Sequence, residues 1–129
     1  VVDGVSYINY SKATTVASTE VAMAAMDRPF VLLLGGIHKG APYTPLLAHV
    51  KPHCVAVVAY GEAAPVAAAD LASGVAVHRA GNLDEAVGIA SGIAPGGGAV
   101  LLSPACSSFD QFPNYGARGM RFRELVRAM

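Results

Sequence analysis

Five short apolar runs recur along the chain, and the segments between them have helical composition. Most of the runs are continuous rather than alternating, a pattern typical of strands covered on both faces in a parallel sheet. The predicted strands are Val5–Ile8, Phe30–Leu34, Cys54–Ala59, Val75–His78 and Ala99–Leu102. The predicted helices are Val16–Met26, Glu62–Ala72, Leu83–Ile93 and Phe122–Met129. This alternation predicts an α/β fold, with a doubly wound, mostly parallel sheet, right-handed crossovers and flanking helices.

The length and charge of the chain narrow the choice of partners. Its 129 residues suffice for a single domain, 1–129, with a real core. Because nine basic residues balance nine acidic ones, we expect no nucleic-acid partner. The apolar runs fall well short of the ~20 residues that cross a bilayer, so we expect no membrane partner. Free thiols at Cys54 and Cys106 fit a reducing cytoplasm. Four arginines near the C-terminus are expected to form a solvated helix face: Arg118, Arg121, Arg123 and Arg127.

The cysteines and histidines do not suggest a metal site or a disulfide framework. Cys54 lies inside an apolar run and is expected to be a small buried residue, whereas the position of Cys106 in the third polar segment would allow it to face a ligand. His49 and His53 are separated by Lys51-Pro52, which breaks any helix that would align the two imidazoles. We therefore expect no bound metal.

Polar chemistry concentrates in three loops, each of which follows a predicted strand: Asn9–Thr15, Gly35–Tyr43 and Ser103–Tyr115. In a doubly wound sheet, ligands bind beyond the carboxyl ends of the strands. In the first loop, the hydroxyls of Thr14 or Thr15 can simply cap the next helix. Lys12 favours a second interpretation, because an ammonium beside a helix N-terminus is disfavoured unless an anion lies between them.

The other two loops add a cation and a hydroxyl. Gly35–Gly40 carries Lys39 but lacks P-loop spacing, and a Gly-Gly turn is more often only a turn. Ser108–Gln111 has the pattern of a capping box, and a well-capped helix would explain it. Taken together, however, the side chains of the three loops would form a pocket suited to a small dianion such as an acidic amino acid. Those side chains are Lys12, Thr14, Lys39 and Ser108.

The same loops resemble the C-terminal domain of the Mur ligases, in particular the members that add D-glutamate. The resemblance runs from Asp3 to Leu125 and depends on the order of several motifs. They are Ser11-Lys12-Ala13-Thr14 with Ala17–Glu20, Leu33–Gly36 with Lys39-Gly40, and Leu102–Cys106 followed by Ser108, Asp110–Phe112 and Arg118-Gly119.

The resemblance implies a Rossmann-like domain of a cytoplasmic bacterial ligase of peptidoglycan synthesis. That enzyme uses ATP and Mg²⁺ to join D-glutamate to UDP-N-acetylmuramoyl-L-alanine. It also implies that this chain is the last of three domains, without the N-terminal UDP-binding and central ATP-binding domains. The chain alone is therefore expected to be inactive and to hold no cofactor of its own.

The resemblance assigns roles to individual residues. Thr14 and Lys39 would hold one carboxylate of D-glutamate, and Ser108 with the backbone around Tyr115 would hold the other. Lys12 would act catalytically near the phosphates. Tyr10 stands next to the nucleotide, where family members usually carry an acidic residue.

Two alternatives stay open. The chain could come from a related ligase that adds a different amino acid, of the folylpolyglutamate-synthase kind, although Ser107–Asp110 speaks against this. It could instead be an α/β module that binds an anion without chemistry.

Overall fold

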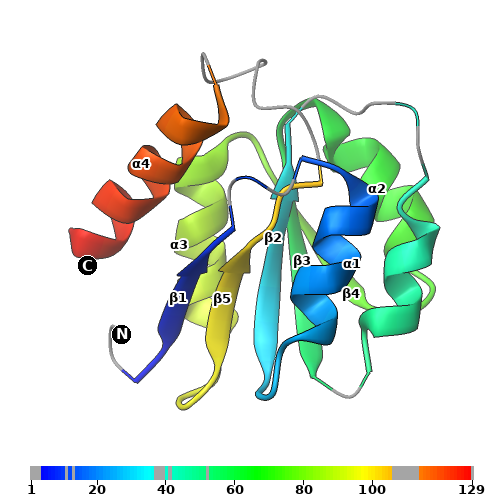
Figure 1. Cartoon of the computed structure of the whole chain (residues 1–129), viewed down its shortest axis with the longest axis horizontal. Coiled ribbons are helices and arrows are strands. Elements are labelled where there is room, and N and C mark those ends of the chain that lie inside the picture. Colours follow the sequence, from blue (N-terminus) through cyan, green and yellow to red (C-terminus); the bar gives the residue numbers. More distant parts are fainter. Residues whose placement is uncertain are drawn as a thin grey trace.

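The computed structural model describes residues 4–10, 12, 14–36, 40, 42–51, 53–105 and 114–128. Within them, five parallel strands form one sheet in the order β1-β5-β2-β3-β4 (Figure 1). The strands are β1 Ser6–Asn9, β2 Phe30–Gly35, β3 Cys54–Tyr60, β4 Ala76–Ala80 and β5 Ala99–Leu102. The predicted doubly wound α/β fold is confirmed, and each predicted strand is present with small shifts at its ends.

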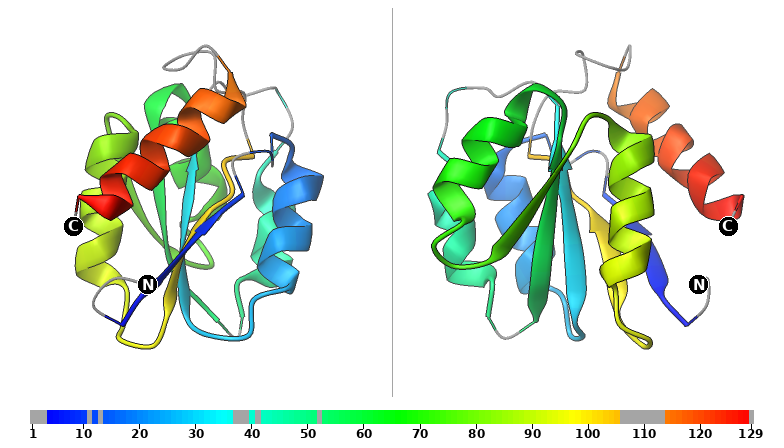
Figure 2. Two further views of the ribbon diagram at one scale, coloured as in Figure 1. Left: turned by 60° about the vertical axis from the view of Figure 1, so that its left-hand side comes forward. Right: turned by 180° about the vertical axis from the view of Figure 1, so that it is seen from behind.

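Helices cover both faces of the sheet (Figure 2). One face carries α1 Val16–Ala24, α2 Ala64–Leu71 and the 3₁₀ helix η1 Thr44–His49, and the other carries α3 Leu83–Ile93 and α4 Tyr115–Arg127. A short 3₁₀ turn, η2 Gly61–Ala63, leads into α2. Because the sheet is covered twice, its strands need apolar residues at consecutive positions.

The two cores show this directly in β2, whose residues are buried throughout. Leu32 and Leu34 pack into the core on the α1 side, whereas Val31 and Leu33 pack into the core on the α3 side. Each of these four side chains is 0% exposed. At about 1.5–3 kcal/mol for each buried aliphatic side chain, the central strand is a main source of stability.

The last helix differs from its prediction. It begins at Tyr115 rather than at Phe122, because Asn114 caps it: the Asn114 Oδ1 accepts a hydrogen bond from the Ala117 backbone N–H at 2.8 Å. Gly116 and Gly119 in its first turns hid the helical composition of this segment.

The longer helix also corrects the expectation of a fully solvated arginine face. Arg118 is 0% exposed, since it lies one turn before the buried Phe122 on the inward face of α4. Arg121 is on the surface and forms an ion pair with Asp84 of α3, with its Nε 3.0 Å from the Asp84 Oδ1. Arg123 and Arg127 border a hollow of about 210 Å³ between α4 and β1.

Candidate functional site

The carboxyl ends of β1, β5 and β2 lie next to one another in the sheet, and backbone hydrogen bonds continue beyond the strands. The Tyr10 N–H donates to the Leu102 carbonyl at 2.7 Å. The Ser103 N–H donates to the Leu33 carbonyl at 3.2 Å, and the Gly35 N–H donates to the Pro104 carbonyl at 3.2 Å. The three predicted loops therefore leave the sheet side by side, at one edge.

In the first loop, the structure decides which hydroxyl caps the helix. Thr15 is the N-cap of α1: its Oγ1 accepts from the Ser18 N–H at 3.1 Å and lies 2.8 Å from the Ser18 Oγ. Thr14, which is half-buried, does not serve as this cap. The hydroxyl of Thr14 is thus not committed to the cap of α1.

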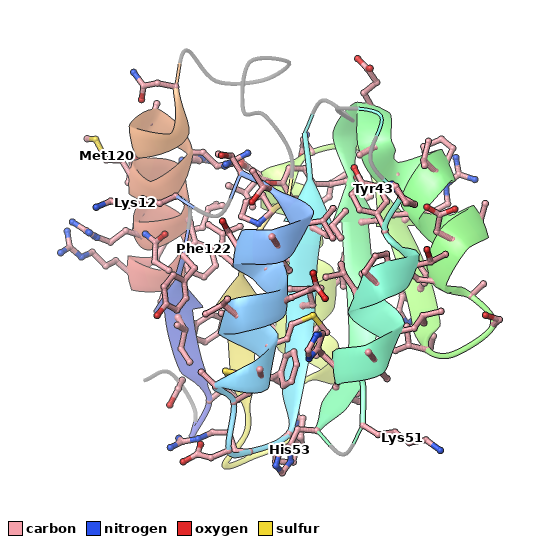
Figure 3. The ribbon with its side chains drawn as sticks, turned by 45° about the vertical axis from the view of Figure 1, so that its right-hand side comes forward. Lys12, Tyr43, Lys51, His53, Met120 and Phe122 are labelled. Atoms are coloured by element: carbon pink, nitrogen blue, oxygen red, sulfur yellow. The ribbon has the colours of Figure 1, made fainter. Side chains whose placement is uncertain are left out.

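Lys12 is exposed in the same loop and extends from the end of β1 (Figure 3). With Tyr10, Ser18 and Val21 it lines an open hollow of about 300 Å³ on the outer side of α1. Tyr10 is 50% exposed and Val21 is 72% exposed, so this hollow joins an ammonium to an apolar surface. Such a surface suits a ligand with both an anionic and a flat apolar part.

The second loop starts where the backbones of β2 and β3 approach closely. A Cβ on Gly35 would lie 2.5 Å from the Tyr60 carbonyl oxygen, so only glycine fits there. Gly36 has a φ of 126° and accepts a hydrogen bond from the Ala63 N–H at 3.0 Å. At the far end of the loop, the N–H of the buried Tyr43 donates to Asp70 Oδ2 at 3.0 Å. Lys39 lies outside the described residues.

The third loop starts from a tightly held corner. Ser103 is fully buried against Thr19 of α1, and Ala105 has a φ of 58°, in the left-handed region that non-glycine residues rarely adopt. Ser108, its predicted capping box and Cys106 lie outside the described residues. Tyr115 begins α4, so its backbone belongs to the first helical turn, whereas its side chain is not described.

Sequence reasoning did not single out the links that hold these loops together. The Thr19 hydroxyl and the Asn9 amide both bond across to other elements. Asn9 directly follows an apolar run, which is a weak indication, whereas Thr19 stands between Ser18 and Glu20 and gave no such signal.

Among the described residues, the side chains with shifted pKa values lie outside the three loops. Burial raises the pKa of the Cys54 thiol to about 12. The residue packs against the core, but it is half-buried rather than fully buried as expected. Hydrogen bonds from Arg121 lower the pKa of Asp84. His49 lies 3.2 Å from Glu20, Nε2 to Oε1, which joins η1 to α1. Among the described residues, no group of three or more His, Cys, Asp or Glu side chains is arranged to hold a metal ion.

In the part of the chain that the structure describes, no helix has both the length and the apolar character that a membrane span requires.

Comparison with known proteins gives closely similar relatives but no matching family model. The UDP-N-acetylmuramoylalanine–D-glutamate ligase of Salinibacter ruber is 45% identical over 129 residues, 99% of this chain. The ligases of the same name from Chlamydia caviae and Myxococcus xanthus are each 43% identical, over 98% and 100% of this chain. The chain spans only 28–30% of the length of these three relatives.

The parallel sheet, with three loops that start at its carboxyl edge, defines a doubly wound α/β domain of the kind that binds ligands at that edge. Within this class, the sequence identity to the relatives above assigns the chain to the Mur ligases. The chain is a homologue of the C-terminal region of the member that adds D-glutamate, UDP-N-acetylmuramoylalanine–D-glutamate ligase.

Proposed function

We propose that this chain is the D-glutamate-binding part of an ADP-forming ligase that extends UDP-N-acetylmuramoyl-L-alanine in bacterial peptidoglycan synthesis. The observation that carries the proposal is the similarity, over 98–100% of this chain, to part of two relatives named UDP-N-acetylmuramoylalanine–D-glutamate ligase. The geometry supports it, because the three loops that would bind the amino acid start at one edge of the sheet.

The proposed reaction has two steps. The carboxylate of UDP-N-acetylmuramoyl-L-alanine takes the γ-phosphoryl group of ATP, which gives an acyl phosphate and ADP. The amine of D-glutamate then attacks the acyl carbon, the nitrogen loses a proton as the amide forms, and inorganic phosphate leaves with the bonding electrons of the C–O bond. Mg²⁺ would neutralise phosphate charge, and we assign it and most contacts to ATP to the parts of the cytoplasmic enzyme outside this chain.

This chain would hold the amino acid and aim its amine. Thr14 and Lys39 would bind one carboxylate, and Ser108 with the backbone at Tyr115 would bind the other. Fixed donors of this kind accelerate a reaction because the bound amine no longer has to find its orientation. Lys12 would stabilise charge that develops on the phosphoryl oxygens, which is an electrostatic role in catalysis. Its exposure at the sheet edge leaves it accessible to phosphates held by another part of the enzyme.

Tyr10 would lie next to the nucleotide. Its exposed ring and the hollow beside Lys12 offer an apolar surface there, rather than the carboxylate that the resemblance to the Mur ligases implies. The substitution Tyr10→Asp is therefore expected to change the KM for ATP and to leave the KM for D-glutamate unchanged.

The first test measures ADP release by the whole protein, with ATP, Mg²⁺ and UDP-N-acetylmuramoyl-L-alanine, across a panel of D- and L-amino acids. Release that depends on D-glutamate supports the proposal. Release with another amino acid identifies a sister ligase, and no release with any amino acid indicates a module that only binds.

Variants then test the residues. Lys39→Ala and Ser108→Ala are each expected to raise the KM for D-glutamate, since each removes a contact worth about 1–3 kcal/mol. Lys12→Ala is expected to lower kcat more than it raises KM. Lys51→Ala is the matched control, because this exposed lysine lies at the opposite end of the sheet (Figure 3). An unchanged KM in both loop variants would refute the assignment of the pocket.

A further inference from the structure

Two sets of side-chain hydrogen bonds join the first loop to the third. In one, the Thr19 Oγ1 donates to the Ser103 carbonyl at 3.1 Å, and the Ser103 Oγ donates back to the Thr19 Oγ1 at 3.0 Å. In the other, the Asn9 Nδ2 donates to the Gly119 carbonyl at 3.1 Å. We call these two sets the loop staples.

The loop staples hold both loops at both ends. The first loop lies between Asn9, at the end of β1, and α1, which carries Thr19. The third loop lies between Ser103, directly after β5, and α4, which carries Gly119. Asn9, at the beginning of the first loop, is therefore bonded to α4, the helix after the third loop. Thr19, in the helix after the first loop, is bonded to Ser103 at the beginning of the third loop.

The Thr19–Ser103 staple is shielded from water. Both residues are 0% exposed, so water cannot replace either hydroxyl as a partner. Loss of one hydroxyl leaves the other polar group buried without its bond, which is costlier than an exposed hydrogen bond would suggest. Immediately beyond, Ala105 is 3% exposed and holds its left-handed φ of 58°. A strained residue of this kind persists only where its surroundings fix it, and the staple is part of those surroundings.

We propose that Thr19, Ser103 and Asn9 are positioning residues for amino-acid binding, because they fix both flanks of the loop that carries Lys12 and Thr14 relative to the start of the third loop. This inference rests on the proposed function. None of the three needs to touch the substrate. They act by fixing the relative positions of the first and third loops, which together would form the binding site. This matters because a displacement of about 1 Å can cost up to about a hundredfold in rate.

The test uses the whole protein with Thr19→Val and Thr19→Ser. Valine keeps the shape of threonine and removes the hydroxyl, whereas serine keeps the hydroxyl. We expect Thr19→Val to raise the KM for D-glutamate about tenfold or more, with the KM for UDP-N-acetylmuramoyl-L-alanine within about twofold. Thr19→Ser should restore most of the affinity for D-glutamate. Asn9→Leu should raise the same KM independently, because it breaks the other staple.

A control separates positioning from general stability. Val87 is 1% exposed in the core on the α3 side and belongs to neither loop, so Val87→Ala lowers the melting temperature without breaking a staple. Its KM for D-glutamate should stay at the value of the unsubstituted protein. The combined Thr19→Val and Ser103→Ala variant should show less than the product of the two single effects, because both changes break one link.

The positioning role and the proposed function fail in different ways. An unchanged KM for D-glutamate in Thr19→Val, at a temperature where the variant is folded, would overturn the positioning role alone. A rise in this KM in Val87→Ala that equals the rise in Thr19→Val would also overturn the positioning role. No ADP release by the unsubstituted protein with D-glutamate would overturn the proposed function and, with it, the positioning role.

Discussion

Gly35 lies at the carboxyl end of β2, where the buried ring and backbone of Tyr60 in β3 occupy the space that a side chain would need. An ideal Cβ on Gly35 would be 2.5 Å from the Tyr60 carbonyl oxygen and 2.6 Å from both Cγ and Cδ1 of its ring. Neither neighbour is the end of a flexible chain, so the backbone of one strand has to shift. Gly35→Ala is therefore expected to destabilise the fold.

The magnitude follows from two opposing effects. Forcing an extra carbon into a packed site typically costs about 1–3 kcal/mol, and a clash with strand backbone belongs near the upper end of that range. Alanine loses less backbone entropy than glycine on folding, which returns about 0.5–1 kcal/mol. The net loss is about 2 kcal/mol, which lowers the melting temperature of a chain of this size by roughly 6–10 °C.

Gly88 supplies the matched control. It lies on the exposed side of α3, and a Cβ there would meet nothing within 4 Å. The same substitution, Gly88→Ala, should therefore stabilise the chain by about 0.5–1 kcal/mol, because alanine favours a helix over glycine. Thermal unfolding of the 129-residue chain, followed by circular dichroism, measures both. Equal shifts of the same sign in the two variants would refute the steric reasoning.

Three further changes test other parts of the structure. Asn114→Ala should cost about 1 kcal/mol in urea unfolding, whereas Asn114→Ser should cost little, since serine can also cap α4. Asp84→Asn should lower the melting temperature slightly at neutral pH. The folded pKa of Asp84 lies below its ordinary 3.8, so this difference should shrink as the pH falls through the folded value, and also in high salt, where the pair with Arg121 is screened. In a Cys106→Ser background, native Cys54 should resist alkylation until the chain unfolds, and because its pKa is raised from 9.0 to about 12, stability should fall as the pH rises through that interval. Equal costs for Asn114→Ala and Asn114→Ser would contradict the role of the cap. A pH-independent effect of Asp84→Asn would contradict the role of the ion pair, and rapid alkylation of the folded chain would contradict the protection of Cys54.

Much of the fold could be predicted from the sequence, because its strands are continuous apolar runs and few architectures bury both faces of a strand. The start of α4 could not, since two glycines weakened the helical pattern and the cap at Asn114 resembles an ordinary loop residue. The wrong expectation for Arg118 followed from that error. With a later predicted start of the helix, Arg118 was assigned to solvent, whereas it is buried.

For the candidate site, the sequence supplied the residue types and their order. It predicted that three loops follow three strands and that they carry cations and hydroxyls, which suit an anion. The roles of Lys12, Thr14, Lys39, Ser108 and Tyr115 stay proposals, and Tyr10 stays the expected neighbour of the nucleotide.

By itself, the sequence determined the alternation of strands and helices, the two-sided burial of the sheet and the similarity to the D-glutamate-adding ligases, because these depend on patterns that are local or shared along the whole chain. Only the tertiary structure decided that β5 lies between β1 and β2, which brings the loops together although about ninety residues separate the first from the third. It alone decided the bond between Thr19 and Ser103, since a hydrogen bond between distant residues depends on how helices pack on the sheet and leaves no local pattern in the sequence.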